Sequence, residues 1–445
     1  MILALRHVLL VSPDRVAPEM AGPGIRYAEL ARTLTRSHHV RLAAPHGSVS
    51  SADVPIIETY DPQRRGSLDQ VIAGADVVVA PPLAPALIRC VEKLGRPWIV
   101  DLYNPEPFEG LAHARPSASH DRLQDIVRID RLAYAARAGS SFICASERQR
   151  DMWLGLLAAH RRLDSREYRR DPELRGLIDV VPFGVPSATP TRRNDRLRGA
   201  VFPSDAKIMV WNGGVWEWLD PETVLTALAL LRGQDPSWRL SFSGVGRPSH
   251  RATMGGSERV RSLSARLGLD VDGAVHLREW TPYLDRATPL LDADLGVSAH
   301  VPSVEARFAH RARMVDLMWT RTPILCSEGD ESAAIVREEG LGEAVVPQDP
   351  EAFAAAAVRI ADRGRDFYRA ALDAAAAKRE WGVAAAPLLG LIDSAIVGRG
   401  RGSGVVGRAV ALRHTVAFAV RRPAAALGRA RRVPGNSAGA MPDTH

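Results

Sequence analysis

Short apolar segments of five to seven residues recur along the first half of the chain, separated by longer amphipathic spans. They occupy residues 7–12, 40–44, 75–80, 97–103 and 141–145. Between the first two segments, Tyr27, Leu30, Ala31 and Leu34 have the i, i+3, i+4, i+7 spacing of one helix face. Strands that alternate with helices in this way predict a parallel sheet covered by helices on both faces.

The same alternation restarts in the second half. A polar segment with prolines and arginines ends at about residue 198, and strands are then predicted at 207–211, 239–243, 274–277, 295–298, 324–327 and 343–346. The chain is therefore predicted to be an α/β protein with two Rossmann-like domains that face a central cleft, residues 1–185 and 199–380. A helix at 381–397 is expected to cross back to the first domain.

The remaining residues, 398–445, form a basic tail. From Ser394 to Pro442 there are nine arginines and no acidic residue, so the formal net charge of +7 belongs to the tail rather than to the folded domains. Apolar residues at 405, 409, 412, 416 and 420 share one helical face, which suits an anionic membrane surface. A disordered tail is the alternative, and the absence of aromatic residues among its early arginines argues against a nucleic-acid partner.

Composition places the chain among ordinary soluble proteins. Its three cysteines, Cys90, Cys144 and Cys326, are far apart and lack metal-binding spacing, which favours a reducing compartment. We expect no signal peptide and no transmembrane helix, because the N-terminal apolar run is short and no uncharged run of about 18 residues follows. The predicted location is cytoplasmic, with peripheral attachment to the inner membrane face through the tail.

The densest candidate chemistry lies in the segment from Ser298 to Leu325. It follows a buried-looking strand and contains two acids with arginines between them, namely Glu305, Arg307, Arg311, Arg313 and Asp316. Ligands of open α/β sheets bind at the carboxyl ends of strands, where this segment is expected. Arginine matches phosphate oxygens and carboxylates match vicinal hydroxyls, so the combination indicates a nucleotide-sugar. An amphipathic helix with a solvated charged face is the alternative.

Two further features suggest a phosphate site in the second half. Gly213 and Gly214 separate a predicted strand from a helix that Asp220 caps, so backbone N–H groups there can approach an anion. Arg247 follows the neighbouring strand at the equivalent end. A structural turn and a solvated arginine are the alternatives for these features.

The first half offers residues for the opposite side of the cleft. Gly24 and Arg26 open the first helix, and Asp101 ends the fourth strand, where it can orient an acceptor hydroxyl or cap a turn. No metal site is predicted: Asp292 and Asp294 lead into a buried strand, and the histidines lack ligand spacing.

These motifs together resemble bacterial sugar transferases with the GT-B fold, most closely glycosyltransferase family 4, over about residues 7 to 390. The resemblance is carried by the segments 22–31, 143–150, 181–185, 211–220 and 305–323. It implies two Rossmann-like domains, with the nucleotide-sugar bound mainly by the second domain and the acceptor by the first. It also implies transfer with retention of anomeric configuration and without a metal or other cofactor.

The family's paired acids guide the assignment of individual residues. Asp316 matches the second acid, which holds the ribose, and Glu305 would be the first, although ten residues separate them here instead of seven. The family's usual Arg/Lys phosphate pair is absent after the glycine loop, so Arg247, Arg311 or Arg313 must replace it.

The resulting hypothesis is a metal-independent, retaining glycosyltransferase that moves a sugar from a nucleotide-sugar to a saccharide or lipid-linked acceptor. Glu305 and Arg313 are the predicted catalytic residues. The predicted donor-binding residues are Gly213, Gly214, Arg247, Arg311 and Asp316, and Gly24, Arg26 and Asp101 are predicted at the acceptor side or cleft. The alternatives are a GT-B sugar-nucleotide epimerase or phosphorylase and a non-catalytic nucleotide-sugar binding partner.

Overall fold

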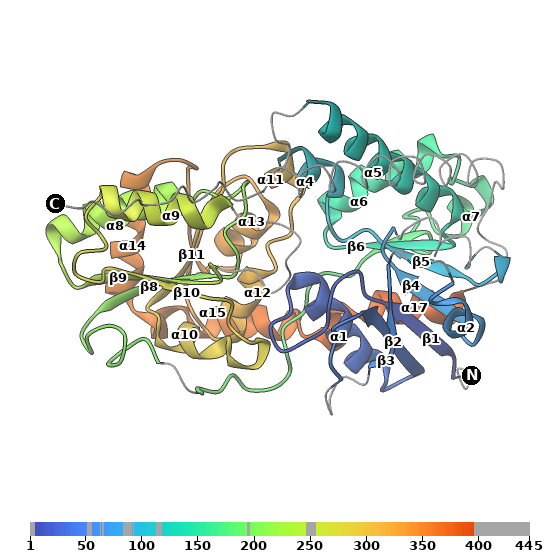
Figure 1. Ribbon diagram of the computed structural model, residues 1–445, viewed down its shortest axis with the longest axis horizontal. Helices are drawn as coiled ribbons and strands as arrows, with labels where there is room; N and C mark the ends of the chain where they lie inside the picture. The colour runs from blue at the N-terminus through green and yellow to red at the C-terminus, as the bar shows by residue number, and fades with distance from the viewer. Residues whose placement is uncertain are drawn as a thin grey trace, which may run out of the picture.

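The computed structural model describes residues 5–50, 56–62, 64, 66–82, 91, 93–112, 118–193, 196–245 and 255–395. It consists of two α/β domains, each built on a parallel sheet (Figure 1). The predicted fold class is confirmed, and the basic tail and Arg247 lie outside the described residues.

The N-terminal domain contains a seven-stranded sheet in the order β3-β2-β1-β4-β5-β6-β7. Its strands are β1 (His7–Val11), β2 (His39–Pro45), β3 (Ile56–Tyr60), β4 (Val77–Ala80), β5 (Trp98–Asp101), β6 (Ser141–Cys144) and β7 (Ile178–Val180). Its helices are α1 (Gly22–Leu34), α2 (Asp69–Ala73), α4 (Glu106–Ala112), α5 (Ala118–Ala138), α6 (Glu147–Ala159) and α7 (Ser165–Arg170). Helices cover both faces, so the central strands β4 and β5 are buried, and all their residues are apolar except Asp101 at the end of β5.

The C-terminal domain contains a six-stranded sheet in the order β10-β9-β8-β11-β12-β13. Its strands are β8 (Lys207–Asn212), β9 (Trp238–Ser243), β10 (Val275–Arg278), β11 (Leu295–Ser298), β12 (Ile324–Ser327) and β13 (Gly342–Val345). Helices α8 (Pro221–Gln234) and α9 (Gly255–Arg266) cover one face, and α10 (Ala287–Asp292) lies on the other (Figure 1). The remaining elements are η1 (Tyr283–Asp285), α11 (Val304–Phe308), α12 (Arg313–Trp319), α13 (Glu331–Glu338), α14 (Pro350–Arg363) and α15 (Arg365–Lys378).

Of the strands in the two sheets, the apolar segments of the sequence do not include the three-residue β7 and the edge strand β3. This strand lies at the edge of the first sheet and pairs only with β2, with a register irregularity between Leu42 and Ala43. An edge strand buries less side-chain surface, so its sequence, Ile-Ile-Glu-Thr-Tyr, carries a weaker apolar signal than the central strands do. None of the described helices is long and apolar enough to cross a membrane.

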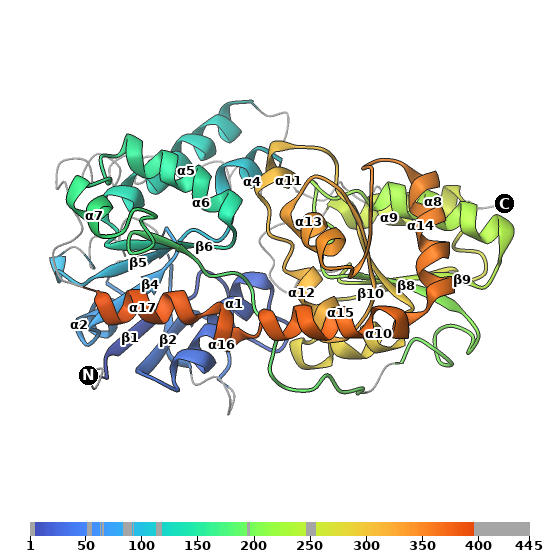
Figure 2. The same cartoon turned by 180° about the vertical axis from the view of Figure 1, so that it is seen from behind.

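The chain passes between the domains twice. After α15 it returns through α16 (Trp381–Ala384) and α17 (Ala386–Ser394), which lie against the N-terminal domain (Figure 2). The two crossings are bonded to each other: the Val185 N–H donates to the Arg379 carbonyl (2.7 Å) and the Trp381 N–H donates to the Val185 carbonyl (3.0 Å). Gly184 permits this contact, because a Cβ there would lie 2.6 Å from Cδ2 of Trp381.

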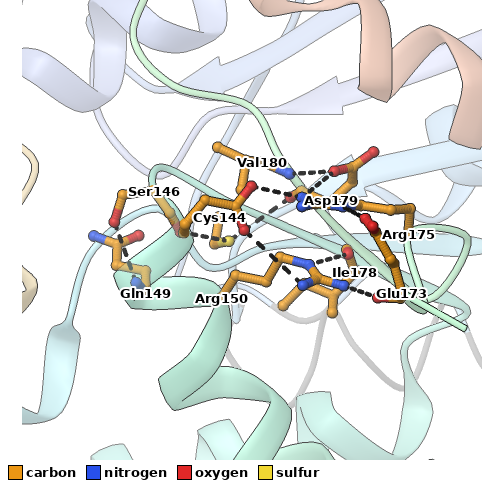
Figure 3. A network of polar contacts seen from close by, with 10 residues as sticks. Cys144, Ser146, Gln149, Arg150, Glu173, Arg175, Ile178, Asp179 and Val180 are labelled. Carbon is orange, nitrogen blue, oxygen red and sulfur yellow. Dashed lines mark hydrogen bonds and ion pairs between the residues drawn. The ribbon is translucent and has the colours of Figure 1, made fainter.

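Polar side chains fasten α6 to the end of the first sheet (Figure 3). Ser146 caps α6 by accepting a hydrogen bond from the Gln149 N–H (3.1 Å). The buried Arg150 donates to the carbonyls of Ile178 (3.0 Å) and Glu173. Side-chain amide Nε2 of Gln149 donates both to the Tyr103 carbonyl (3.0 Å) and, across the domain boundary, to the Phe308 carbonyl (2.9 Å).

Arg26 and Asp101 form an ion pair inside the N-terminal domain. Nε and Nη2 of Arg26 donate to the two carboxylate oxygens of Asp101 at 2.8 and 3.0 Å, and both side chains are fully buried. The guanidinium also lies over the rings of Tyr103 and Phe183, at 5.1 and 5.4 Å. Burial alone would lower the pKa of Arg26, but Asp101 raises it above its ordinary value. This pair joins α1 to the end of β5 instead of presenting either charge to an acceptor.

Asp101→Asn is expected to destabilise the N-terminal domain by about 3–5 kcal/mol, because it leaves a buried guanidinium without its counter-charge. Urea unfolding followed by circular dichroism measures the change. The control is Asp366→Asn, which removes an exposed pair with Arg369 and should leave the free energy of unfolding close to that of the parent. Equal effects of the two substitutions would contradict a structural role for the buried pair.

Candidate active site

A cavity of about 380 Å³ lies between the two domains at the carboxyl ends of their strands. Residues that follow β1 and β5 line it from the first domain, and residues at the ends of β8 and β9 line it from the second; among them are Asp14, Tyr103, Asn212 and Ser243. This is the position where open α/β sheets bind ligands. The structure places Gly213, Gly214, Glu305, Arg311, Arg313 and Asp316 in its lining.

The glycine loop after β8 contributes backbone to the cavity. Gly213 has φ +90°, a conformation that L side chains rarely adopt. The Gly214 carbonyl accepts hydrogen bonds from Nε1 of Trp211 (3.4 Å) and Nη2 of Arg313 (2.8 Å). Asp220 already caps α8 by accepting from the Thr223 N–H (3.0 Å), and no residue of α8 lines the cavity. The loop therefore holds the side chain of Arg313 through a backbone carbonyl. The sequence had suggested instead that the loop brings the N-terminus of α8 to an anion.

Glu305 and Arg311 form a second buried ion pair. Glu305 lies on α11, which Ser303 caps, and its two carboxylate oxygens accept from Nη1 and Nη2 of Arg311, both at 3.0 Å. Nε of Arg311 donates to Asp330 at 3.3 Å. Burial alone would lower the pKa of Arg311, but the two carboxylates raise it. Arg311 is thus neutralised from two sides and holds Glu305 in one orientation at the cavity wall.

Arg313 lies in the same segment without any ion pair to a described residue. Nη2 donates to the Gly214 carbonyl, and the guanidinium lies 5.1 Å above the Trp211 ring. Nη1 is buried and has no hydrogen-bond partner. Burial and then the charge of Arg311 lower the pKa of Arg313 to about 9. The group therefore remains protonated at neutral pH, and its charge is available to an anion in the cavity.

Two side chains orient Asp316, and the sequence patterns had predicted neither of them as a site residue. Nε of Arg286 donates to one carboxylate oxygen (3.0 Å) and Nδ2 of Asn212 donates to the other (3.2 Å). Arg286 is itself held between the rings of Tyr283 (3.6 Å) and Trp319 (4.5 Å). Arg286 lines the cavity, and its place between a strand end and a helix start was a signal that could have identified it.

The first-domain residues predicted for the cleft do not line it. Arg26 and Asp101 are bound to each other within the domain core, and Gly24 packs so closely against the Arg15 carbonyl that a Cβ would lie 2.4 Å from its oxygen. Their neighbours Gly22 and Pro23, at the start of α1, reach the cavity instead. These three assignments fail because strand ends and helix starts hold structural and ligand-facing residues alike.

His310 also lines the cavity, although its spacing gave no functional signal. Its ring stacks on Phe183 at 6.2 Å and 16°, and neither ring nitrogen has a hydrogen-bond partner. Burial, followed by the positive charges of Arg26, Arg379 and Arg311, lowers the pKa of His310 to about 4. The imidazole is therefore neutral at physiological pH.

Solved structures with a similar fold are GT-B glycosyltransferases. HepE of Anabaena, solved with UDP and glucose, matches with a TM-score of 0.61 and 14% identity over 88% of this chain and 100% of that one. Sucrose-phosphate synthase of Thermosynechococcus elongatus matches at 0.57 and 16% over 87% and 98%. WaaG, a glycosyltransferase involved in lipopolysaccharide biosynthesis, matches at 0.55 and 14% over 87% and 99%.

No protein-family model matches the chain, and no curated protein matches it. The structural similarities establish the GT-B fold, in which two Rossmann-like domains enclose a cleft between them. The residues that line the cleft, rather than sequence identity, must therefore support any statement about its chemistry.

The lowered pKa of His310 predicts a pH-dependent stability. A histidine that ionises near pH 6.5 when unfolded and near 4 when folded contributes stability above pH 6.5 that is lost as the pH falls toward 4. His310→Phe keeps a ring against Phe183 and removes this contribution. The parent should lose roughly 1–2 kcal/mol more of its free energy of unfolding than the variant between pH 7 and pH 5, measured by urea denaturation. Parallel losses would show that His310 is not coupled to folding.

Proposed function

We propose that this protein is a glycosyltransferase that moves a sugar from a nucleotide-sugar to a saccharide or lipid-linked acceptor. The observation that carries the proposal is Arg313, a positive charge without an acidic partner among the described residues, in an interdomain cavity whose other lining arginines are neutralised. A diphosphate is the group that such a charge suits best. The GT-B fold supports the proposal independently, since HepE, which shares it, binds UDP and UDP-glucose.

The proposed chemistry is departure of a nucleoside diphosphate from the anomeric carbon. Negative charge then develops on the leaving diphosphate, and Arg313 would stabilise it within a cavity of low dielectric constant. Asp316, oriented by Arg286 and Asn212, would accept hydrogen bonds from the ribose hydroxyls. Glu305 would contact the transferred sugar while Arg311 holds the carboxylate in place.

We further propose that transfer proceeds with retention of configuration and needs no metal. Arg313 would provide the leaving-group stabilisation that a metal ion can supply. Closure of the two domains around this cavity would exclude bulk water, which favours transfer over hydrolysis of the donor.

Arg313→Ala should weaken UDP binding roughly 10–100-fold, because hydrogen bonds to charged groups contribute about 1.5–3 kcal/mol. Isothermal titration calorimetry with UDP measures the change. The matched control is Arg307→Ala, an exposed arginine of the same segment outside the cavity, which should bind UDP like the parent. Unchanged UDP affinity in the Arg313 variant would remove the proposed diphosphate site.

The proposal of a lipid-linked acceptor and a peripheral membrane location rests on the sequence of the basic tail. Deleting residues 398–445 is expected to reduce co-sedimentation with vesicles that contain phosphatidylglycerol, because it removes nine arginines of this segment. Vesicles of phosphatidylcholine alone provide the control. Equal sedimentation of the full-length and truncated chains would leave a soluble saccharide as the favoured acceptor.

A further inference from the structure

One acidic side chain of the N-terminal domain lines the cavity without a hydrogen bond or ion pair to any described residue. Glu109 lies on α4, which directly follows Pro105, and both residues line the cavity. Helix α4 packs against α11 of the other domain, where the rings of Phe108 and Phe308 stack at 5.6 Å and 15°. Because α11 carries Glu305, this contact brings Glu109 of the first domain close to Glu305 of the second.

Four carboxylates line the cavity, and three of them are already bound. Both oxygens of Glu305 accept from Arg311, and the oxygens of Asp316 accept from Arg286 and Asn212. Asp14 accepts a hydrogen bond from the N–H of its neighbour Arg15 (2.9 Å).

The carboxylate of Glu109 is the fourth, and it has no hydrogen bond and no ion pair with any residue that the structure describes. Glu106, one turn earlier on the same helix, differs: it forms ion pairs with Arg131 and, at 4.0 Å, with Arg128. The free carboxylate on α4 is therefore the one that faces the cavity.

The surroundings of Glu109 favour proton exchange at neutral pH. Burial is the main cause that raises its pKa to about 7, and the negative charge of Glu305 acts in the same direction. Arg311 and Arg128 oppose this shift. A base is most effective when its pKa lies near the working pH. His310 also lines the cavity with ring nitrogens that have no hydrogen-bond partner, but it is a weaker base because its pKa is about 4.

We propose that Glu109 binds the acceptor hydroxyl and takes its proton during glycosyl transfer, an assignment that rests on the proposed function. In this step the O–H bond of the acceptor breaks and the proton moves to a carboxylate oxygen of Glu109. The acceptor oxygen forms a bond to the anomeric carbon on the face from which the diphosphate leaves, so that the configuration is retained, and the bond from that carbon to the diphosphate oxygen breaks with its electron pair on the diphosphate. Glu109 afterwards releases the proton to water.

The experiment uses UDP-glucose as the donor and water as the acceptor, with released UDP as the readout. In the parent, kcat/KM for hydrolysis should rise as the pH increases through about 7, because the carboxylate must lose its proton before it can act as a base. Glu109→Gln should lower the rate ~100-fold and abolish this pH dependence. Glu109→Asp, which keeps a carboxylate, should recover part of the activity.

UDP affinity, measured by calorimetry, separates this assignment from the proposed function. Glu109→Gln should bind UDP within about twofold of the parent, and thermal unfolding should show that it folds. Glu106→Gln is the matched control and should keep both the rate and the pH profile. A Glu109→Gln enzyme with the parent's rate and pH profile would overturn the assignment. So would a parent that hydrolyses UDP-glucose at a rate independent of pH, since the carboxylate must lose its proton before it acts as a base. A parent that binds no UDP would instead remove the donor site on which the proposal rests.

Discussion

The wall of the cavity depends on Arg311, a buried arginine that contacts a carboxylate on each of two sides. This buried guanidinium bonds Glu305 through a bidentate contact and Asp330 through a third bond, so that each of the three charges has a partner of opposite sign. Asp330 also caps α13 by accepting from the Ala333 N–H (2.8 Å), which anchors the pair to a helix. Removing one member would leave a buried charge without its partner, at a cost far above that of an exposed pair. The fixed pair in turn leaves Arg313 as the group able to attract an anion.

The apolar pattern was sufficient for the fold because buried parallel strands need apolar side chains on both faces. It could not divide the polar residues at strand ends into structural and ligand-facing sets. Arg26 and Arg313 illustrate this: both lie near a helix start, but Arg26 pairs with Asp101 of its own domain, whereas Arg313 pairs with no acid in the part of the chain that the structure describes. Arg26 and Asp101 are 75 positions apart in the chain, and local spacing does not encode a contact over that separation.

Glu109 and Arg286 were not predicted as site residues for a related reason. Neither belongs to a motif with regular spacing, and each acquires its surroundings from the approach of distant elements. The separation of Glu305 and Asp316 is also explained by the fold. They lie on two short helices, α11 and α12, with residues 309–312 between them, so the number of intervening residues need not match a helical repeat. Both acids reach the cavity wall despite the longer spacing.

The hydrogen-bonded crossing at Val185 and Trp381 has a mechanical consequence. Two covalent connections that ran separately would let the domains rotate about several axes. Here they are fastened side by side through two backbone hydrogen bonds, so they behave as a single pivot. Rotation about that pivot can widen the cavity to admit a bulky substrate, whereas sliding or pulling apart would break both bonds. The direction of domain opening is therefore restricted by the backbone itself, independently of what the cavity binds.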